Sequence, residues 1–290
     1  MIVDLHATYP ELSIRRLCAL TGTGRTWYYR RPSAQHQRVR DGEVLGAIVA
    51  LRAQDAGQSY GYRRITAALQ YQGMAINHKR VVRIMREHDL LVRPKRAFVV
   101  TTDSAHRDRI YPNLAPSVVL ERPNQLWVAD ITYIQLPTSD CYLACLLDAF
   151  SRCCVGWHLD RTLATTLPLT ALERAIATRA PGPGLIHHSD RGVQYASARY
   201  TDRLHSIEAQ ISMSRVGNPY DNATVESFYK TLKHEAVYLH DYRTFAEAQA
   251  HLGYWIETVY NTQRLHSRLG YRPPVAFEEA HMAAVATHGQ

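Results

Sequence analysis

The sequence of 290 residues lacks the marks of a membrane, secreted or zinc-stabilised protein. No apolar run approaches the roughly 20 residues that a membrane-spanning helix needs, and the first residues lack the basic start and apolar core of a signal peptide. The five cysteines are odd in number and contain no C-x-x-C pair, which argues against a disulfide framework or a zinc ribbon and favours buried free thiols. We therefore expect a folded protein without membrane contact that stays in the cytoplasm.

Acidic residues are scarce in the first part of the chain. Up to Leu120 there are 19 Lys and Arg against 9 Asp and Glu, whereas from Glu121 onward there are 15 against 17. The net charge of +8 thus belongs to the N-terminal part, which favours a polyanionic partner for that part. The alternative is a solvated basic surface, as on many enzymes.

The basic part has a helical pattern. Residues 13–20, a Gly22/Gly24 break and the aromatic and basic residues 25–31 outline a helix-turn-helix. Further helices are expected at 41–53, around Ile65 and Leu69, and after Asn77 as a cap. Basic side chains interleaved with apolar ones suit phosphate contacts or a major groove. The candidates for DNA binding are Arg63, Arg64, Lys79, Arg80 and Arg83.

After a proline-containing stretch at 92–124, read as a linker with one strand at most, the pattern changes to strands. Three strand-like runs at 126–134, 141–148 and 153–159 with short turns predict an antiparallel meander. Helix 167–179, strand 185–188, helix 198–207, strand 210–213 and a long helix from 222 to about 238 follow. The pattern predicts an α/β fold with a mixed sheet.

Three carboxylates in this half stand where chemistry is expected. Asp130 interrupts an apolar strand, where an unpaired buried carboxylate is costly and calls for a partner or a metal. Asp190 ends another strand, at the sheet edge where open α/β folds bind ligands; the alternative is a helix N-cap. Glu226 shares a helix face with Asn222, Lys230 and Lys233, for which the alternative is a solvated face with a Glu226–Lys230 ion pair.

Asp130, Asp190 and Glu226, with 35 residues between the last two, resemble the Asp-Asp-Glu triad of the retroviral-integrase superfamily. Further segments resemble one branch, the bacterial insertion-sequence transposases encoded in two frames, and in particular their second-frame catalytic protein. These segments are YGYRRI (60–65), DLL (89–91), HSDRGVQY (188–195), Asp221-Asn222-Ala223, Glu226-Ser227-Phe228, Tyr260-Asn261 with Arg264 and His266, and LGYRPP (269–274). The resemblance extends from about Ser59 to Phe277.

This resemblance implies a ribonuclease-H-like catalytic core behind a small all-helical DNA-binding region. It implies metal-dependent cleavage and strand transfer of insertion-sequence ends, with Asp130, Asp190 and Glu226 holding two Mg²⁺ or Mn²⁺ ions. Lys230 and Lys233 would hold phosphates, and Asn222 and His188 would support the ligands from behind. The implied partners are the element's terminal inverted repeats and target DNA, further copies of the chain on DNA, and the upstream-frame protein. The implied location is the bacterial nucleoid.

Two other functions are compatible with these residues. One is a nuclease of the same fold that cleaves without joining. The other is a DNA-binding regulator of the element with a degenerate core, against which the intact carboxylates count, since a degenerate site is free to lose them. The tail residues Arg264, His266 and Arg272 are expected either to touch DNA or to pack onto the core.

The predicted boundaries follow from these patterns. A partial helix-turn-helix segment is expected at 1–34, a helical DNA-binding domain at 35–93 and a linker at 94–124. The catalytic core is expected at 125–240, and a C-terminal helix with a basic tail at 241–290.

Overall fold

The structure is a computed structural model that describes residues 2–25, 34–92, 109–137, 140–215 and 222–288. It divides into two compact units. One comprises Met1–Gln54 and Gly61–Leu91, and the other comprises Asp55–Tyr60 and Val92–Gln290. Each unit is described by itself below.

The first unit is helical, as predicted. Helix α1 (Ile2–Thr8), which the sequence pattern did not indicate, packs on α2 (Ile14–Leu20) through Ile2, Leu17 and Cys18. The Ser13 hydroxyl caps α2 by accepting from the Arg16 amide at 3.4 Å. The second half of the predicted helix-turn-helix falls on residues 26–33, which lie outside the described residues.

Three longer helices complete this unit: α4 (Ala34–Arg52), α5 (Tyr62–Tyr71) and α6 (His78–Glu87). Asn77 caps α6 as predicted, because its side chain accepts from the Lys79 amide at 2.8 Å. The apolar face of each helix is buried, with Ile48, Leu69 and Met85 at 0% exposure. These side chains share one core, so the charged residues between them remain on the surface.

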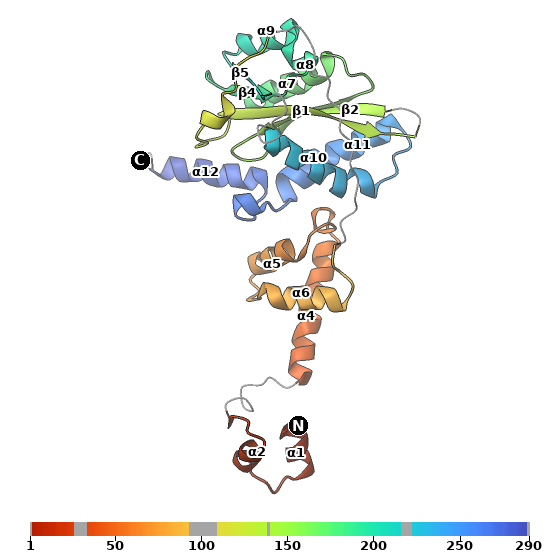
Figure 1. Cartoon of the computed structure of the whole chain (residues 1–290), viewed down its shortest axis with the longest axis vertical. Coiled ribbons are helices and arrows are strands. Elements are labelled where there is room, and N and C mark those ends of the chain that lie inside the picture. The colour runs from red at the N-terminus through yellow and green to blue at the C-terminus, as the bar shows by residue number, and fades with distance from the viewer. Residues whose placement is uncertain (1, 26–33, 93–108, 138–139, 216–221, 289–290) are drawn as a thin grey trace. The chain divides into compact units, whose positions relative to one another are not determined.

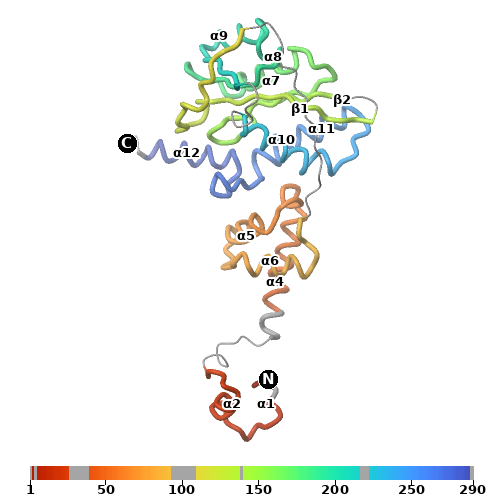
Figure 2. Tube along the Cα trace, in the orientation of Figure 1, coloured from red at the N-terminus to blue at the C-terminus, as the bar shows by residue number. Residues whose placement is uncertain are grey.

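The second unit contains a five-stranded mixed sheet of order β3-β2-β1-β4-β5. Strands β1 (Leu126–Gln135), β2 (Asp140–Asp148) and β3 (Cys154–Asp160) form the predicted antiparallel meander. Strands β4 (Ile186–Ser189) and β5 (Gln210–Met213) pair parallel, β4 with β1 and β5 with β4. The predicted α/β fold with a mixed sheet is confirmed, and the trace of Figure 2 follows it through the unit.

Helices cover both faces of the sheet (Figure 1). Helices α7 (Thr166–Arg179), α8 (Val193–Ala196) and α9 (Ala198–Ser206) lie on one face, and α10 (Ala223–Glu235), α11 (Phe245–Tyr254) and α12 (Pro274–His288) lie on the other. Gly156 lets α7 pack closely on β3, because a Cβ there would lie 2.3 Å from the Ala171 carbonyl oxygen. The predicted long helix is shorter than expected: α10 ends at Glu235 and a 3₁₀ turn, η4 (Val237–Leu239), follows.

The stretch before the sheet has less structure than the rest. Between residues 109 and 125 the chain forms one 3₁₀ turn, η2 (Ala115–Ser117), and no strand. The Leu114 amide donates to the Ser212 hydroxyl at 2.8 Å, and the Met213 amide donates to the Pro112 carbonyl oxygen at 3.3 Å. This segment therefore covers the open edge of β5. Residues 93–108 of the predicted linker lie outside the described residues.

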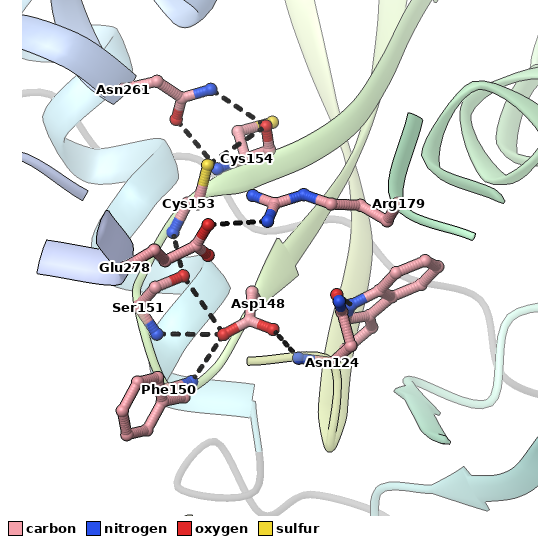
Figure 3. A network of polar contacts seen from close by, with 10 residues as sticks. Asn124, Asp148, Phe150, Ser151, Cys153, Cys154, Arg179, Asn261 and Glu278 are labelled. Carbon is pink, nitrogen blue, oxygen red and sulfur yellow. Dashed lines mark hydrogen bonds and ion pairs between the residues drawn. The ribbon is translucent and has the colours of Figure 1, made fainter. Parts of the chain in front are cut away.

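The C-terminal residues are bonded into the core (Figure 3). The π-helical segment η5 (Trp255–Gln263) carries Asn261, whose amide bonds both the amide (2.9 Å) and the carbonyl oxygen (3.0 Å) of Cys154. On α12, Glu278 accepts from Arg179 of α7 at 2.6 Å. Arg264 is buried in an ion pair with Glu235 at 2.6 Å, so of its two expected roles the structure shows packing onto the core.

The cysteines and the helices can be compared with what their sequence predicted. All five cysteines are buried free thiols, as predicted. Within the described part of the chain, no helix has both the length and the apolar character that crossing a membrane requires.

Candidate active site

Asp130 lies in the middle of β1, where the strand has passed the end of β4. Strand β4 pairs with β1 from Leu126 to Val128 only, so the next residues of β1 run beyond it. Asp130 is half-buried, and its Oδ1 atom accepts from the Ile131 amide at 2.8 Å. No other described residue donates a hydrogen bond to this carboxylate, and burial raises the pKa of Asp130.

Asp190 follows the last residue of β4, at the carboxyl end of the strand as predicted. Its Oδ1 atom accepts from the Gly192 amide at 2.9 Å. A Cβ at residue 192 would lie 3.0 Å from that same oxygen, so glycine allows the close turn. The N-cap of the following short helix α8 is Gly192, so capping does not account for Asp190.

Glu226 lies in the first turn of α10 and is exposed. Glu226 and Lys230 are both exposed, and among the described residues no ion pair joins them, so the structure shows the solvated face of the predicted alternative without its ion pair. Partial burial raises the pKa of Glu226. Helix α10 packs against β1 and β2, and the charge of Glu226 acts on Asp130 of β1.

The charges of the three carboxylates act on one another at Asp130. Burial, then the charge of Asp190 and then that of Glu226 raise the pKa of Asp130 to about 8, against the bond from Ile131 and the attraction of Lys233. The charges of Asp190 and Glu226 thus reach Asp130 in the folded chain, although the three residues are far apart in sequence. In the described residues, no three acidic, histidine or cysteine side chains already form a group tight enough to hold a metal.

The two predicted phosphate-binding lysines differ in their surroundings. Lys233 is half-buried with its Nζ atom 5.1 Å from the centroid of the Tyr133 ring on β1. Burial lowers the pKa of Lys233, although the charge of Asp130 acts in the opposite direction. Lys230 is exposed. Lys233 is therefore the lysine that faces the carboxylates.

The two predicted supporting residues occupy different places. Asn222, at the N-cap of α10, is buried and its Nδ2 atom donates to the Ala129 carbonyl oxygen at 3.4 Å, next to Asp130. His188 is fully buried between β4 and β5, with Nδ1 2.8 Å from the Ser212 hydroxyl and Nε2 3.0 Å from the Ser214 hydroxyl. His188 therefore holds the two strands together below Asp190.

Two tyrosines without a role in the sequence analysis surround the same carboxylates. The Tyr229 hydroxyl donates to the Asp130 carbonyl oxygen. The Tyr195 hydroxyl is buried with no hydrogen-bond partner among the described residues; burial raises its pKa, and the charges of Asp130 and Asp190 contribute in the same direction. The Oδ1 atom of Asn222 is also buried and has no partner within that part of the chain. In an apolar helix or strand, a tyrosine fits the pattern of a core residue. The hydrophobic periodicity of the sequence therefore does not indicate that these two tyrosines lie beside the carboxylates.

The predicted DNA-contact residues lie in the other unit. Arg80 and Arg83 both contact Asp41 of α4 at 2.7 Å, and Arg83 also contacts Glu87 at 2.9 Å. These two arginines therefore join α6 to α4. Lys79 and Arg63 are exposed, and the Arg63 guanidinium lies 5.5 Å from the centroid of the Tyr62 ring. Arg64 is half-buried.

The mixed sheet with acidic residues on β1, after β4 and on α10 defines an integrase core. Models of the integrase core domain match residues 121–219 and 207–274, ranges that include Asp130 and Asp190 in the first and Glu226 in the second. A model of an HTH-like domain matches residues 40–98. The ribonuclease-H-like core behind a helical DNA-binding-type region is thereby confirmed.

Comparison with curated proteins identifies the family more closely. The chain is 38% identical over 252 residues to the transposase for insertion sequence element IS904 of Lactococcus lactis, covering 87% of this chain and 98% of that protein. It is 36% identical to the uncharacterized 31 kDa protein of insertion element IS600 of Shigella sonnei, covering 91% and 97%. It is 33% identical to transposase InsF for insertion sequence IS3A of Escherichia coli, covering 94% and 96%. The chain belongs to the insertion-sequence transposases with an integrase core.

Proposed function

We propose that this chain is a DNA transposase that cleaves the ends of an insertion sequence and joins them to target DNA, with Asp130, Asp190 and Glu226 as the catalytic carboxylates. The observation that carries the proposal is the placement of three acidic residues on an integrase core, on β1, directly after β4 and in the first turn of α10, where the charges of Asp190 and Glu226 both raise the pKa of the buried Asp130. Such an arrangement destabilises the folded chain unless a cation compensates it. A cost of this kind is typical of a functional site.

The residues fit a divalent metal in their chemistry. Carboxylate and amide oxygens are the ligands that Mg²⁺ and Mn²⁺ prefer, and a buried unpartnered oxygen, Oδ1 of Asn222, lies beside the carboxylates. We assign two Mg²⁺ or Mn²⁺ ions to Asp130, Asp190 and Glu226. Bound there, they would activate an attacking oxygen and stabilise a leaving oxygen at phosphorus.

The remaining side chains have supporting roles in this proposal. Lys233 supplies a positive charge at Asp130, and Lys230, one turn from Glu226, holds a DNA phosphate. Asn222 fixes the start of α10 against β1, and His188 fixes the strand that ends at Asp190. In the helical unit, the exposed Lys79 and Arg63 and the half-buried Arg64 contact the element ends, whereas the ion pairs of Arg80 and Arg83 favour a structural role for them.

The same proposal covers partners and organisation. DNA transposition brings two ends together, so we propose that several copies assemble on DNA, with the terminal inverted repeats and target DNA as ligands and the upstream-frame protein as a further subunit. The expected boundaries at 34/35, 93/94, 124/125 and 240/241 remain part of this proposal. Because the proposed substrate is DNA, we also propose that the protein acts in the cytoplasm, at the nucleoid.

The deciding experiment compares wild type with Glu226→Gln on a labelled element end in Mg²⁺. Glu226→Gln keeps the size of the side chain and removes its charge, so we expect cleavage and joining to fall by at least about 10³-fold while DNA binding is kept. Glu279→Gln, at an exposed position of α12, is the matched control and should stay active. Equal activity in wild type and Glu226→Gln would refute the assignment, and cleavage without any joined product would identify a nuclease instead.

A further inference from the structure

Tyr229 joins the helix that carries Glu226 to the strand that carries Asp130. It lies three residues after Glu226 on α10 and is buried. Its hydroxyl donates to the Asp130 carbonyl oxygen and lies 3.3 Å from the Leu143 carbonyl oxygen of β2. The side chain therefore reaches from the helix onto the backbone of both central antiparallel strands.

The hydroxyl acts together with Asn222, which lies about two turns earlier on the same side of α10. The Asn222 side chain donates to the Ala129 carbonyl oxygen at 3.4 Å, and the Tyr229 hydroxyl donates to the next carbonyl of β1. Residues three apart on a helix lie one above the other, so Glu226 and Tyr229 share one side of α10. Two adjacent backbone oxygens of β1 thus hold the first two turns of α10, and Glu226 lies between the two contacts.

These contacts hold the start of α10 through backbone oxygens of β1, independently of the charges of the carboxylates. A hydrogen bond stabilises more when it joins buried groups that would otherwise lose their partners. The ring of Tyr229 packs separately, with its centroid 5.5 Å from that of Phe228. The hydroxyl of Tyr229 therefore holds the helix turn, whereas its ring atoms contribute the packing, so the two effects can be separated by removing the hydroxyl alone.

We propose that the Tyr229 hydroxyl is a positioning group of the catalytic site, which holds the Glu226 turn of α10 on the Asp130 backbone and so presets the spacing at which the carboxylates take up a divalent cation. The inference depends on the proposed function, because it concerns the same metal site. It assigns Tyr229 no contact with substrate or metal. Its effect acts through the separation of Glu226 and Asp130.

The test measures Mn²⁺ binding to the full-length chain without DNA, by the electron paramagnetic resonance signal of free Mn²⁺, in wild type and Tyr229→Phe. We expect the Mn²⁺ dissociation constant to rise about fivefold to tenfold in Tyr229→Phe, which corresponds to the loss of one buried hydrogen bond. The Mg²⁺ concentration for half-maximal cleavage of an element end should rise by the same factor. The rate at saturating Mg²⁺ and the affinity for the DNA end should stay near the wild-type values.

Tyr200→Phe is the matched control. The Tyr200 hydroxyl is also buried and hydrogen-bonded, 2.9 Å from Nε2 of His187 in the core on the other face of the sheet. Its removal should lower the thermal midpoint without changing Mn²⁺ affinity. Equal Mn²⁺ affinity in wild type and Tyr229→Phe, with only a lowered midpoint as in Tyr200→Phe, would overturn the positioning role alone. A wild-type chain that binds no Mn²⁺ would overturn the proposed function as well.

Discussion

The β1–β2 ladder carries two aspartates in apolar surroundings, and the fold treats them in opposite ways. Asp148 pairs with Trp127 in the register and is fully buried, yet it accepts four hydrogen bonds, from the amides of Asn124, Phe150 and Ser151 and from the Ser151 hydroxyl. Asp130 pairs with Cys145 three positions along β1, and accepts one, from the Ile131 amide. A complete set of hydrogen-bond donors is typical of a structural carboxylate. An incomplete set of donors is typical of a carboxylate that binds a ligand.

The surroundings of the two aspartates act differently on their pKa values. Burial raises the pKa of both. At Asp148 the bonds from Ser151 and Asn124 oppose burial and have a larger effect than the charge of Glu278, which raises the pKa, whereas at Asp130 the charge of Asp190 is the largest effect after burial and raises the pKa further. Burial alone therefore does not distinguish a catalytic carboxylate from a structural one. The balance between hydrogen-bond donors and like charges around the carboxylate does.

Exchanging each aspartate for asparagine should give the largest contrast. Asp130→Asn should lower Mg²⁺-dependent cleavage by at least about 10³-fold, because a metal ligand supplies several kcal/mol of catalysis, and the chain should remain folded. Asp148→Asn should keep the cleavage rate per folded molecule but unfold more easily by about 2–3 kcal/mol, because an amide group replaces an acceptor of backbone N–H groups. Cleavage rates with urea unfolding curves check both.

The prediction is wrong if Asp148→Asn loses activity or Asp130→Asn keeps it. A stable but inactive Asp148→Asn chain would place the chemistry at the other end of β1. An active Asp130→Asn chain would remove the basis for the proposed metal site.

A smaller effect is expected on stability without metal. The folded-state pKa of Asp130, about 8, lies above its ordinary value of 3.8, so between these two pH values the unfolded chain loses a proton that the folded chain keeps. Folding stability contributed by this group is therefore complete below about pH 4, is lost as the pH rises, and stays lost above about pH 8. Asp130→Asn has no such loss. It should be more stable than wild type by roughly 1–3 kcal/mol at pH 8, less than the full shift implies because water reaches the carboxylate.

Thermal unfolding of both chains in EDTA at pH 5, 6, 7 and 8 measures this difference. The advantage of Asp130→Asn should grow with pH, and excess Mg²⁺ should reduce it by stabilising wild type alone. If the difference in stability between the two chains stays constant across this pH range, Asp130 is ionised throughout. Its acidic neighbours would then not raise its pKa as described.

The same comparison shows what the sequence reveals and what it does not. The strands, the mixed sheet and the three carboxylates follow from residue patterns, because a charged residue inside an apolar run and a known spacing are visible in one dimension. The donors around Asp148 and the bond from Tyr229 to the Asp130 backbone are not, since each joins residues distant in sequence. The pairing of Arg80 and Arg83 with Asp41 was missed for the same reason. Interleaved basic residues indicate an exposed face but not which charges are already paired.

The smallest effect concerns the helical unit, where charges are paired with opposite ones. Lys79→Ala removes an exposed charge at the start of α6, and should weaken binding of the element end a few-fold at about 0.1 M salt and reduce the salt dependence by about one phosphate contact. Arg83→Ala should change DNA affinity less and lower stability by about 1 kcal/mol, because its contacts to Asp41 and Glu87 are only partly buried.

Arg199→Ala, at an exposed site on α9, is the control for the loss of one positive charge. If Arg83→Ala weakens DNA binding more than Lys79→Ala without loss of stability, the ion pairs of α6 open on DNA, and paired charge no longer marks a structural role.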